Sequence, residues 1–173
     1  QRQRVDLTEE RRTQAAEPRR WVDPEQAEDF GRLDPAAIEH VRSDAWPQAR
    51  DADELHEALV GLGFLNPDEI AREGWSALLA QLLGAGRATR LDSPAVWIAA
   101  ERIPQWRALA PGARLEPAID APADYATQAW EADAALVDVL RARLSGLGPV
   151  AVDALLAGLA PLSRASIEAA LIG

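Results

Sequence analysis

The sequence predicts a mainly α-helical protein with one small β-hairpin. Between residues 51 and 83, apolar residues recur at the three- and four-residue spacing of amphipathic helices, and glycines separate the stretches. Two runs of strand-forming residues, 87–91 and 96–100, then flank Asp92-Ser-Pro-Ala95, which is rich in turn formers. Three helices followed by a hairpin is the element order of a winged-helix domain, and we expect one over 34–103, including a leading helix.

Each predicted helix in this unit has its own signals. The first carries one apolar face and ends at Gly63; that face consists of Leu55, Ala58, Leu59 and Leu62. The second starts at Asn66-Pro-Asp-Glu69, where Asn caps the helix, Pro occupies its first position and Glu completes a capping box. The third helix follows Gly74 and ends before Gly84.

The third helix bears on nucleic-acid recognition. Its polar side chains are Ser76 and Gln81 only, whereas a helix that reads bases presents Arg, Lys, Asn or Gln to the groove. A segment apolar nearly all round is expected to be buried on more than one side. We therefore predict that this helix packs against its neighbours and does not enter a DNA groove.

The segments before this unit are more polar. Residues 1–33 are predicted to be a polar linker segment; for residues 1–20 the alternative is a phosphate-contacting arm. A helix start is expected at Asp23-Pro24. A second start at Asp34-Pro35 begins the leading helix. Its predicted buried face consists of Ala37, Ile38, Val41 and Ala45.

The C-terminal half is predicted to hold a connector and a second unit. Residues 104–124 contain four prolines and read as an ordered connector. Residues 125–173 again carry three helical patterns and then stop, as a second winged-helix domain would if truncated before its wing.

Charge and composition limit the functional classes. The net charge is −10, and residues 21–73 hold the excess, with fourteen acids against four arginines. A free-standing duplex binder is usually basic, so the acidic body conflicts with a DNA-reading role. There is no cysteine and no apolar run of the ~18 residues that a membrane span needs, so we expect a cytoplasmic protein without a membrane partner.

No catalytic or metal site is predicted. The chain lacks the Gly-rich loop that cradles ATP phosphates. The acids around His56 suit the first turn of a helix, where its dipole is positive, better than a metal centre.

The basic and aromatic residues supply the candidate contacts. We predict that nucleic-acid backbone is touched by arginines in and after the hairpin, namely Arg87, Arg90, Arg102 and Arg107. The alternative is that these arginines pair with the acidic 21–73 region. Three tryptophans near segment ends are candidate interface anchors: Trp21, Trp46 and Trp106.

Several strings resemble the C-terminal region of large helicase-related (Lhr-type) DNA helicases. The likeness spans most of residues 30–171. It is carried by Gly31-Arg-Leu-Asp-Pro-Ala-Ala-Ile38, Asp44-Ala-Trp-Pro47, Asp51-Ala-Asp-Glu-Leu-His-Glu-Ala-Leu59, Trp97-Ile-Ala-Ala-Glu-Arg102 and Leu147-Gly-Pro-Val-Ala-Val-Asp153.

The resemblance implies a parent that is a bacterial ATP-dependent helicase acting in DNA repair. Its motor, with ATP and Mg²⁺, would lie upstream, and no family catalytic residue maps onto this chain. This region is then expected to be a winged-helix scaffold that supports self-association and accessory DNA binding. The alternatives are a direct DNA-binding module, part of a DNA-glycosylase-like domain and, with less support, a transcription regulator.

Overall fold

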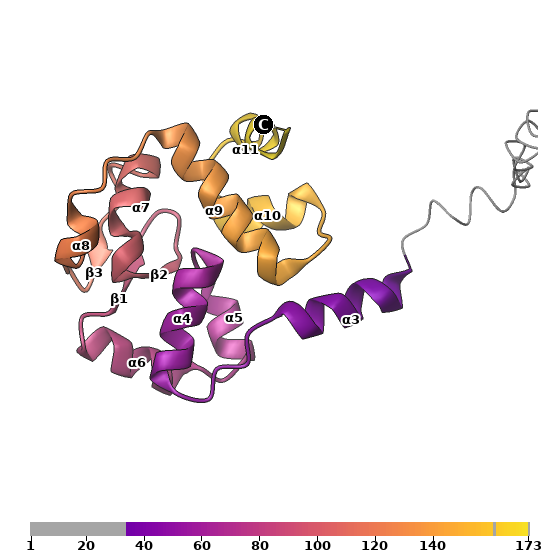
Figure 1. Ribbon diagram of the computed structural model, residues 1–173, viewed down its shortest axis with the longest axis horizontal. Helices are drawn as coiled ribbons and strands as arrows, with labels where there is room; N and C mark the ends of the chain where they lie inside the picture. Colours follow the sequence, from indigo (N-terminus) through magenta and orange to yellow (C-terminus); the bar gives the residue numbers. More distant parts are fainter. Residues whose placement is uncertain (1–33, 161, 173) are drawn as a thin grey trace, which may run out of the picture. The chain divides into compact units, whose positions relative to one another are not determined.

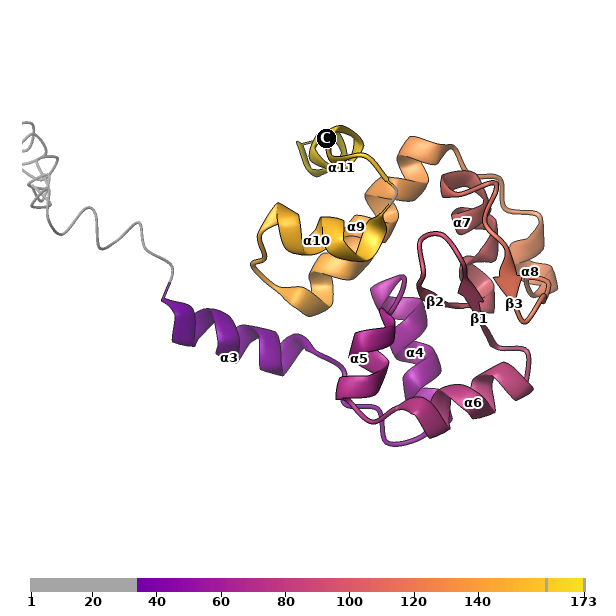
Figure 2. The ribbon, with the colours of Figure 1, turned by 180° about the vertical axis from the view of Figure 1, so that it is seen from behind.

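The computed structural model describes residues 34–160 and 162–172. Over these residues the chain is mainly α-helical, with nine α-helices and one three-stranded antiparallel sheet (Figures 1 and 2). Residues 36–173 form one compact unit. None of the described helices is long and apolar enough to cross a membrane. The predicted linker over 1–33 and the helix start at Asp23 lie outside the described residues.

Three helices follow one another where the apolar periods predict them: α4 (Ala52–Leu62), α5 (Pro67–Arg72) and α6 (Ser76–Gly84). The Asp51 side chain caps α4 by accepting a hydrogen bond from the backbone N–H of Glu54, at 2.9 Å. The Glu69 carboxylate accepts one from the backbone N–H of Asn66, at 2.8 Å, at the start of α5. Local capping chemistry thus sets these helix boundaries.

The predicted hairpin is present as β1 (Ala88–Leu91) and β2 (Trp97–Ala99), which pair antiparallel. A third strand, β3 (Leu115–Glu116), pairs with the other edge of β1, so the order is β2-β1-β3. On the outer edge of β2, Leu65 and Trp97 exchange two backbone hydrogen bonds of 3.0 and 2.8 Å. The hairpin is therefore not a free wing, because it is paired along both edges.

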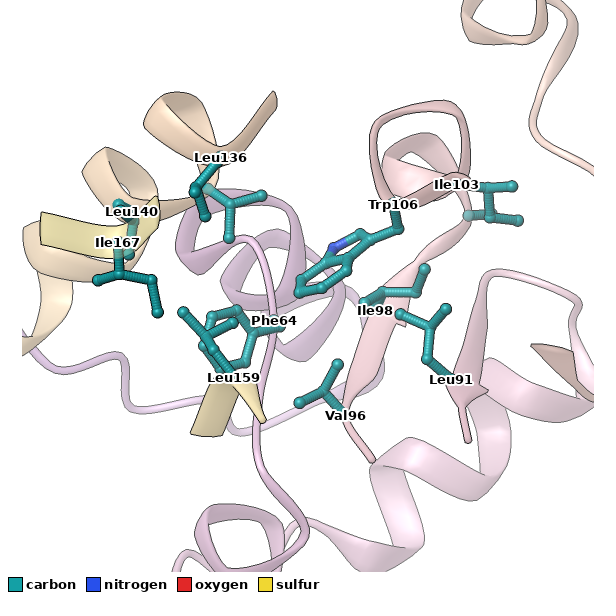
Figure 3. Close-up of a cluster of buried hydrophobic side chains, with 12 residues drawn as sticks. Phe64, Leu91, Val96, Ile98, Ile103, Trp106, Leu136, Leu140, Leu159 and Ile167 are labelled. Atoms are coloured by element: carbon teal, nitrogen blue, oxygen red, sulfur yellow. The ribbon is translucent and has the colours of Figure 1, made fainter. Parts of the chain in front are cut away.

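Two hydrophobic cores lie on the two faces of this sheet. Ala88 and Ala99 point into a core formed with α4 and α6. Leu91 and Ile98 point into a second core that also contains Trp106 (Figure 3). A wing is normally open on one face, so the covered hairpin leaves the predicted winged-helix architecture without confirmation, although the mainly α class is observed.

Most of the elements that follow the hairpin in sequence contribute to the second core. The helical elements after the hairpin are a 3₁₀ turn (Ala100–Arg102), α7 (Ile103–Leu109), α8 (Ala123–Ala126), α9 (Ala132–Leu147), α10 (Val152–Leu159) and α11 (Arg164–Ile172). Buried side chains from Phe64 to Ile167 meet in the second core (Figure 3). The predicted boundaries at 103 and 125 therefore do not separate two cores in the structure.

Two predictions of burial are wrong. In α3 (Pro35–Ala45) no residue is buried, and Val41 is 52% exposed. In α6, Leu79 and Leu82 are buried on one face, but the opposite face is open and carries Ser76, Ala77, Ala80 and Gln81. Helical period alone finds the apolar stripe, and it overestimates burial where small alanines fill the other positions.

Gly146 lies at the contact between α4 and α9. A Cβ at this position would overlap the terminal methyl group of Leu62, so the Leu62 side chain would have to move to admit it. Gly146→Ala should lower the free energy of unfolding by about 1–3 kcal/mol because of this overpacking. Chemical denaturation monitored by circular dichroism measures the change.

Gly61→Ala is the matched control, since a Cβ there meets no atom within 4 Å. It should leave stability unchanged or raise it by up to about 1 kcal/mol. Equal effects of the two substitutions would contradict the close-approach explanation.

Candidate functional site

A polar cleft between helices is a candidate site in the described part of the chain. Its volume is about 700 Å³, and α3, α5, α9 and the start of α10 supply its lining. The sequence separation of these elements explains why no local motif indicates the cleft.

Arg143 and Glu69 form the floor of the cleft. The Arg143 side chain is 3% exposed and pairs with the Glu69 carboxylate, while its Nη1 donates a hydrogen bond to the Phe64 carbonyl at 3.1 Å. Burial lowers the pKa of Arg143, and the charge and hydrogen bonding of Glu69 oppose that shift. The pair joins α9 to the first turn of α5.

Trp46 lies beside this ion pair. The guanidinium groups of Arg72 and Arg143 lie over its ring at 5.4 and 5.5 Å from the centroid, within the range of cation–π attraction. The Trp46 indole Nε1 is buried and has no hydrogen-bond partner among the described residues. The ring is thus held through its faces and not through its polar atom.

The charges in the cleft are balanced pairwise. Arg42 lies 3.4 Å from Glu39, and Arg72 lies 2.9 Å from Glu73, in addition to the buried Arg143 pair. Such a lining lacks the surplus of positive charge that phosphate groups attract. The amides of Gln48 and Asn66 also line it, so the cleft suits a polar group of low net charge, bound through hydrogen bonds.

Of the four arginines predicted to contact nucleic acid, Arg102 has an internal role. Its Nε and Nη2 donate to the Val60 carbonyl at 3.0 and 2.6 Å, and its Nη1 donates to Gln105 at 2.8 Å and Asp138 at 2.6 Å. The side chain connects α4, α7 and α9. A guanidinium used in this way is not available to a phosphate, so the prediction for Arg102 is wrong.

The other three arginines differ in availability. Arg87 pairs with Asp53 in the first turn of α4 at 2.5 Å, as the alternative of pairing with the acidic region predicts. Arg90 is half-buried over the Trp97 ring, 5.8 Å from its centroid, and its Nε has no partner among the described residues. Arg107 is exposed on α7 and forms no ion pair within the described chain.

The tryptophans predicted as interface anchors lie in different surroundings. Trp106 is 1% exposed in the second core, packs edge-on against Phe64 at 5.7 Å and donates its indole N–H to the Gly63 carbonyl at 3.2 Å. It is therefore a core residue, and its prediction as an interface anchor is wrong. Trp46 lies in the cleft, and Trp21 lies outside the described residues.

The acids and His56 at α4 do not come together as a metal centre. Among residues 34–160 and 162–172, no three carboxylate or histidine side chains are placed to hold a metal ion. His56 instead lies 3.0 Å from Glu101 in a half-buried pair that links α4 to the segment after β2.

Comparisons of the chain with protein-family models, with curated proteins and with solved structures found no match.

The buried ion pair generates the first prediction from this site. Arg143→Ala leaves Glu69 and the Phe64 carbonyl without their partner in a buried place, which should cost about 3–5 kcal/mol of unfolding free energy. Replacing both Arg143 and Glu69 by Met should recover part of that loss, because no unpaired charge remains, while the Phe64 carbonyl and the Asn66 N–H still lose their partners. Urea denaturation of the single and double variants measures both effects.

Arg164→Ala removes an arginine from exposed ion pairs and serves as the control, with little expected change in the unfolding midpoint. A loss in the double variant as large as in Arg143→Ala would show that the stability comes from shape alone and not from the charge pair.

Asp138 generates a prediction about pH. Partial burial raises the pKa of Asp138, but hydrogen bonds from Gln105 and Arg102 and the charges of Arg102 and Arg141 outweigh it, so the pKa is lowered from its ordinary value of 3.8. A carboxylate whose pKa is lower in the folded state stabilises the fold above its unfolded pKa. That contribution is lost as pH falls through the folded value.

The stability difference between the native chain and Asp138→Asn should therefore be present at pH 6 and shrink below about pH 4. Thermal unfolding across this pH range provides the measurement, with the exposed Asp124→Asn as control. A difference that stays constant down to pH 2 would contradict the role given to the charged carboxylate.

Proposed function

We propose that this chain is a non-motor scaffold module from the C-terminal region of a bacterial, Lhr-type DNA repair helicase. In this role it supports self-association and makes accessory contacts to DNA. The motor, with its ATP and Mg²⁺, belongs to the upstream part of the parent. The sequence resemblance supports the identity of the parent. The exposed face of α6 and the internal pairing of the arginines support the architectural role.

The open face of α6 is the observation that carries the architectural role. A base-reading helix presents several long polar or cationic side chains to the groove. The exposed positions of α6 carry only small side chains and one amide; they are Ser76, Ala77, Ala80 and Gln81. This surface offers no positive charge to a duplex, which counts against base recognition, and it is open to contact with another protein surface.

The use of the arginines gives a second line of support. Arg87 and Arg102 form ion pairs with acids of this chain, so their charges are compensated before any DNA arrives. Arg90 and Arg107 remain as candidates for backbone contact. Two arginines on an acidic chain suit weak, accessory contact, because affinity for duplex DNA grows with the number of phosphates neutralised.

The second candidate function is a direct DNA-binding module. It is favoured by one observation, namely that Arg107 is exposed and unpaired within the described chain. The two functions differ in expected affinity and in sequence preference.

Fluorescence anisotropy with a labelled duplex at several salt concentrations separates the two. The scaffold proposal predicts non-specific binding with a Kd of about 10⁻⁴–10⁻⁶ M at physiological salt. Arg90→Ala/Arg107→Ala should weaken binding and reduce the salt slope by about one to two. Arg50→Ala/Arg114→Ala removes the same charge from two other exposed arginines and should have a smaller effect.

Nanomolar, sequence-dependent binding that the Arg90/Arg107 change abolishes would favour the direct DNA-binding module. Equal effects of the two double variants would remove Arg90 and Arg107 as contacts. The self-association part is tested by light scattering of the native chain over a range of concentrations, and a monomer throughout would overturn it. Trp46→Ala serves as the interface variant in that experiment, since Trp106 belongs to the core.

A further inference from the structure

The helix α3 is attached to the body of the protein by few contacts. None of its residues is buried, and its apolar positions include Val41, which is 52% exposed. A helix normally stays in place by burying an apolar face, because helices of this length are marginal in isolation. The attachment must therefore come from other contacts.

Arg42 provides the first attachment. Its Nε donates to the Leu147 carbonyl at 3.2 Å, and its Nη2 donates to the Pro149 carbonyl at 3.3 Å. These carbonyls lie at and just beyond the C-terminus of α9, where the helix has free acceptors and a negative dipole end. Both bonds are long and partly open to water, so their contribution is modest.

Trp46 provides the second attachment, directly after α3. Its ring lies against the guanidinium groups of Arg72 and Arg143, but its buried Nε1 has no acceptor among the described residues. A buried donor without a partner costs free energy that an open state, in which water can bind it, does not incur. The surroundings of Trp46 thus stabilise the ring through the two guanidinium groups, but they leave the indole N–H at a cost in free energy.

The helix α3 forms one wall of the polar cleft. Glu39, Arg42 and Ser43 supply this wall of the cavity of about 700 Å³, and residues of α5, α9 and α10 supply the others. By contrast, four residues of α4 are buried, and α4 packs directly on α9. The helix α3 therefore closes one side of the cleft without burying an apolar face in it.

We propose that α3 is a detachable lid over the polar cleft. It is closed when Arg42 and Trp46 are seated, and it opens by rotation of residues 46–50, which connect α3 to α4 without regular structure. Opening moves the Trp46 indole away from Arg143 and exposes the Arg143–Glu69 pair to solvent and to polar groups in the cleft. The core formed by α4, α6, α7 and α9 stays folded during this motion, since α3 contributes no buried residue to it and Trp46 packs against it only as a partly buried side chain.

Hydrogen–deuterium exchange of the whole chain tests the lid. Amides of α3 should exchange at least about a hundredfold faster than those of α4 and α9, since they open without global unfolding. Arg42→Ala and Trp46→Ala should each speed α3 exchange further, by about fivefold. Arg42→Ala should leave the urea midpoint of the core unchanged, whereas Trp46→Ala also removes a partly buried side chain that packs against the first core. Trp46→Phe keeps a ring for the guanidinium groups and removes the unpaired N–H, so α3 should exchange at the native rate or more slowly.

Arg107→Ala, an exposed arginine on α7, is the control and should leave α3 exchange unchanged. Protection of α3 equal to that of α4 would overturn the proposal, because the helix would then open only with the core. Unchanged α3 exchange in both Arg42→Ala and Trp46→Ala would overturn it as well, because the seat would not be where the lid is held. A lower urea midpoint in Arg42→Ala would overturn it too, because α3 would then be part of the folded core.

Discussion

A buried guanidinium needs an acceptor for its charge, and the position of Arg143 shows how this constraint organises the molecule. Its partners, Glu69 and the Phe64 carbonyl, belong to the segment around the start of α5, almost eighty residues earlier in the chain. Glu69 in turn completes the capping of α5 through Asn66. Arg143 therefore links α9, which packs in the second core, to the start of α5, which packs in the first core. The polar cleft is lined by this pair.

These contacts show how an acidic chain uses its arginines. Arginines that seem free in the sequence are used as internal connectors: Arg102 joins three helices, Arg87 returns to α4, and Arg42 reaches the end of α9. Arginine suits this task because its planar group donates several hydrogen bonds at once and stays charged when partly buried. An excess of acids surrounding such connectors leaves little positive field for distant partners, which is why the proposed DNA contacts are accessory.

The sequence predicts those elements that depend on contacts between near neighbours in the chain, and it does not predict features that depend on residues far apart. Helices α4, α5 and α6 and the hairpin were predictable, because apolar spacing, Asn66-Pro67 and the turn at Asp92 act within a few residues. The third strand could not be predicted, because it has only two residues, Leu115 and Glu116, and prolines and a glycine flank it in the sequence. It is a strand only because it pairs with β1. The cleft and the role of Arg102 escaped for the same reason, as their partners lie more than thirty residues away. Trp106 was misjudged because a tryptophan near a proline looks the same in sequence whether it faces inward or outward.

The sheet also has a property that concerns other copies of the chain. Strand edges with free N–H and C=O groups recruit foreign strands and seed aggregation. Here Leu65 occupies the outer edge of β2 by bonding to Trp97, and β3 is only two residues long and is followed by Pro117, which has no N–H to offer. The small sheet thus offers little free backbone at either edge, so strand addition to it is disfavoured and contacts between copies through this part of the chain would use side chains on its helices.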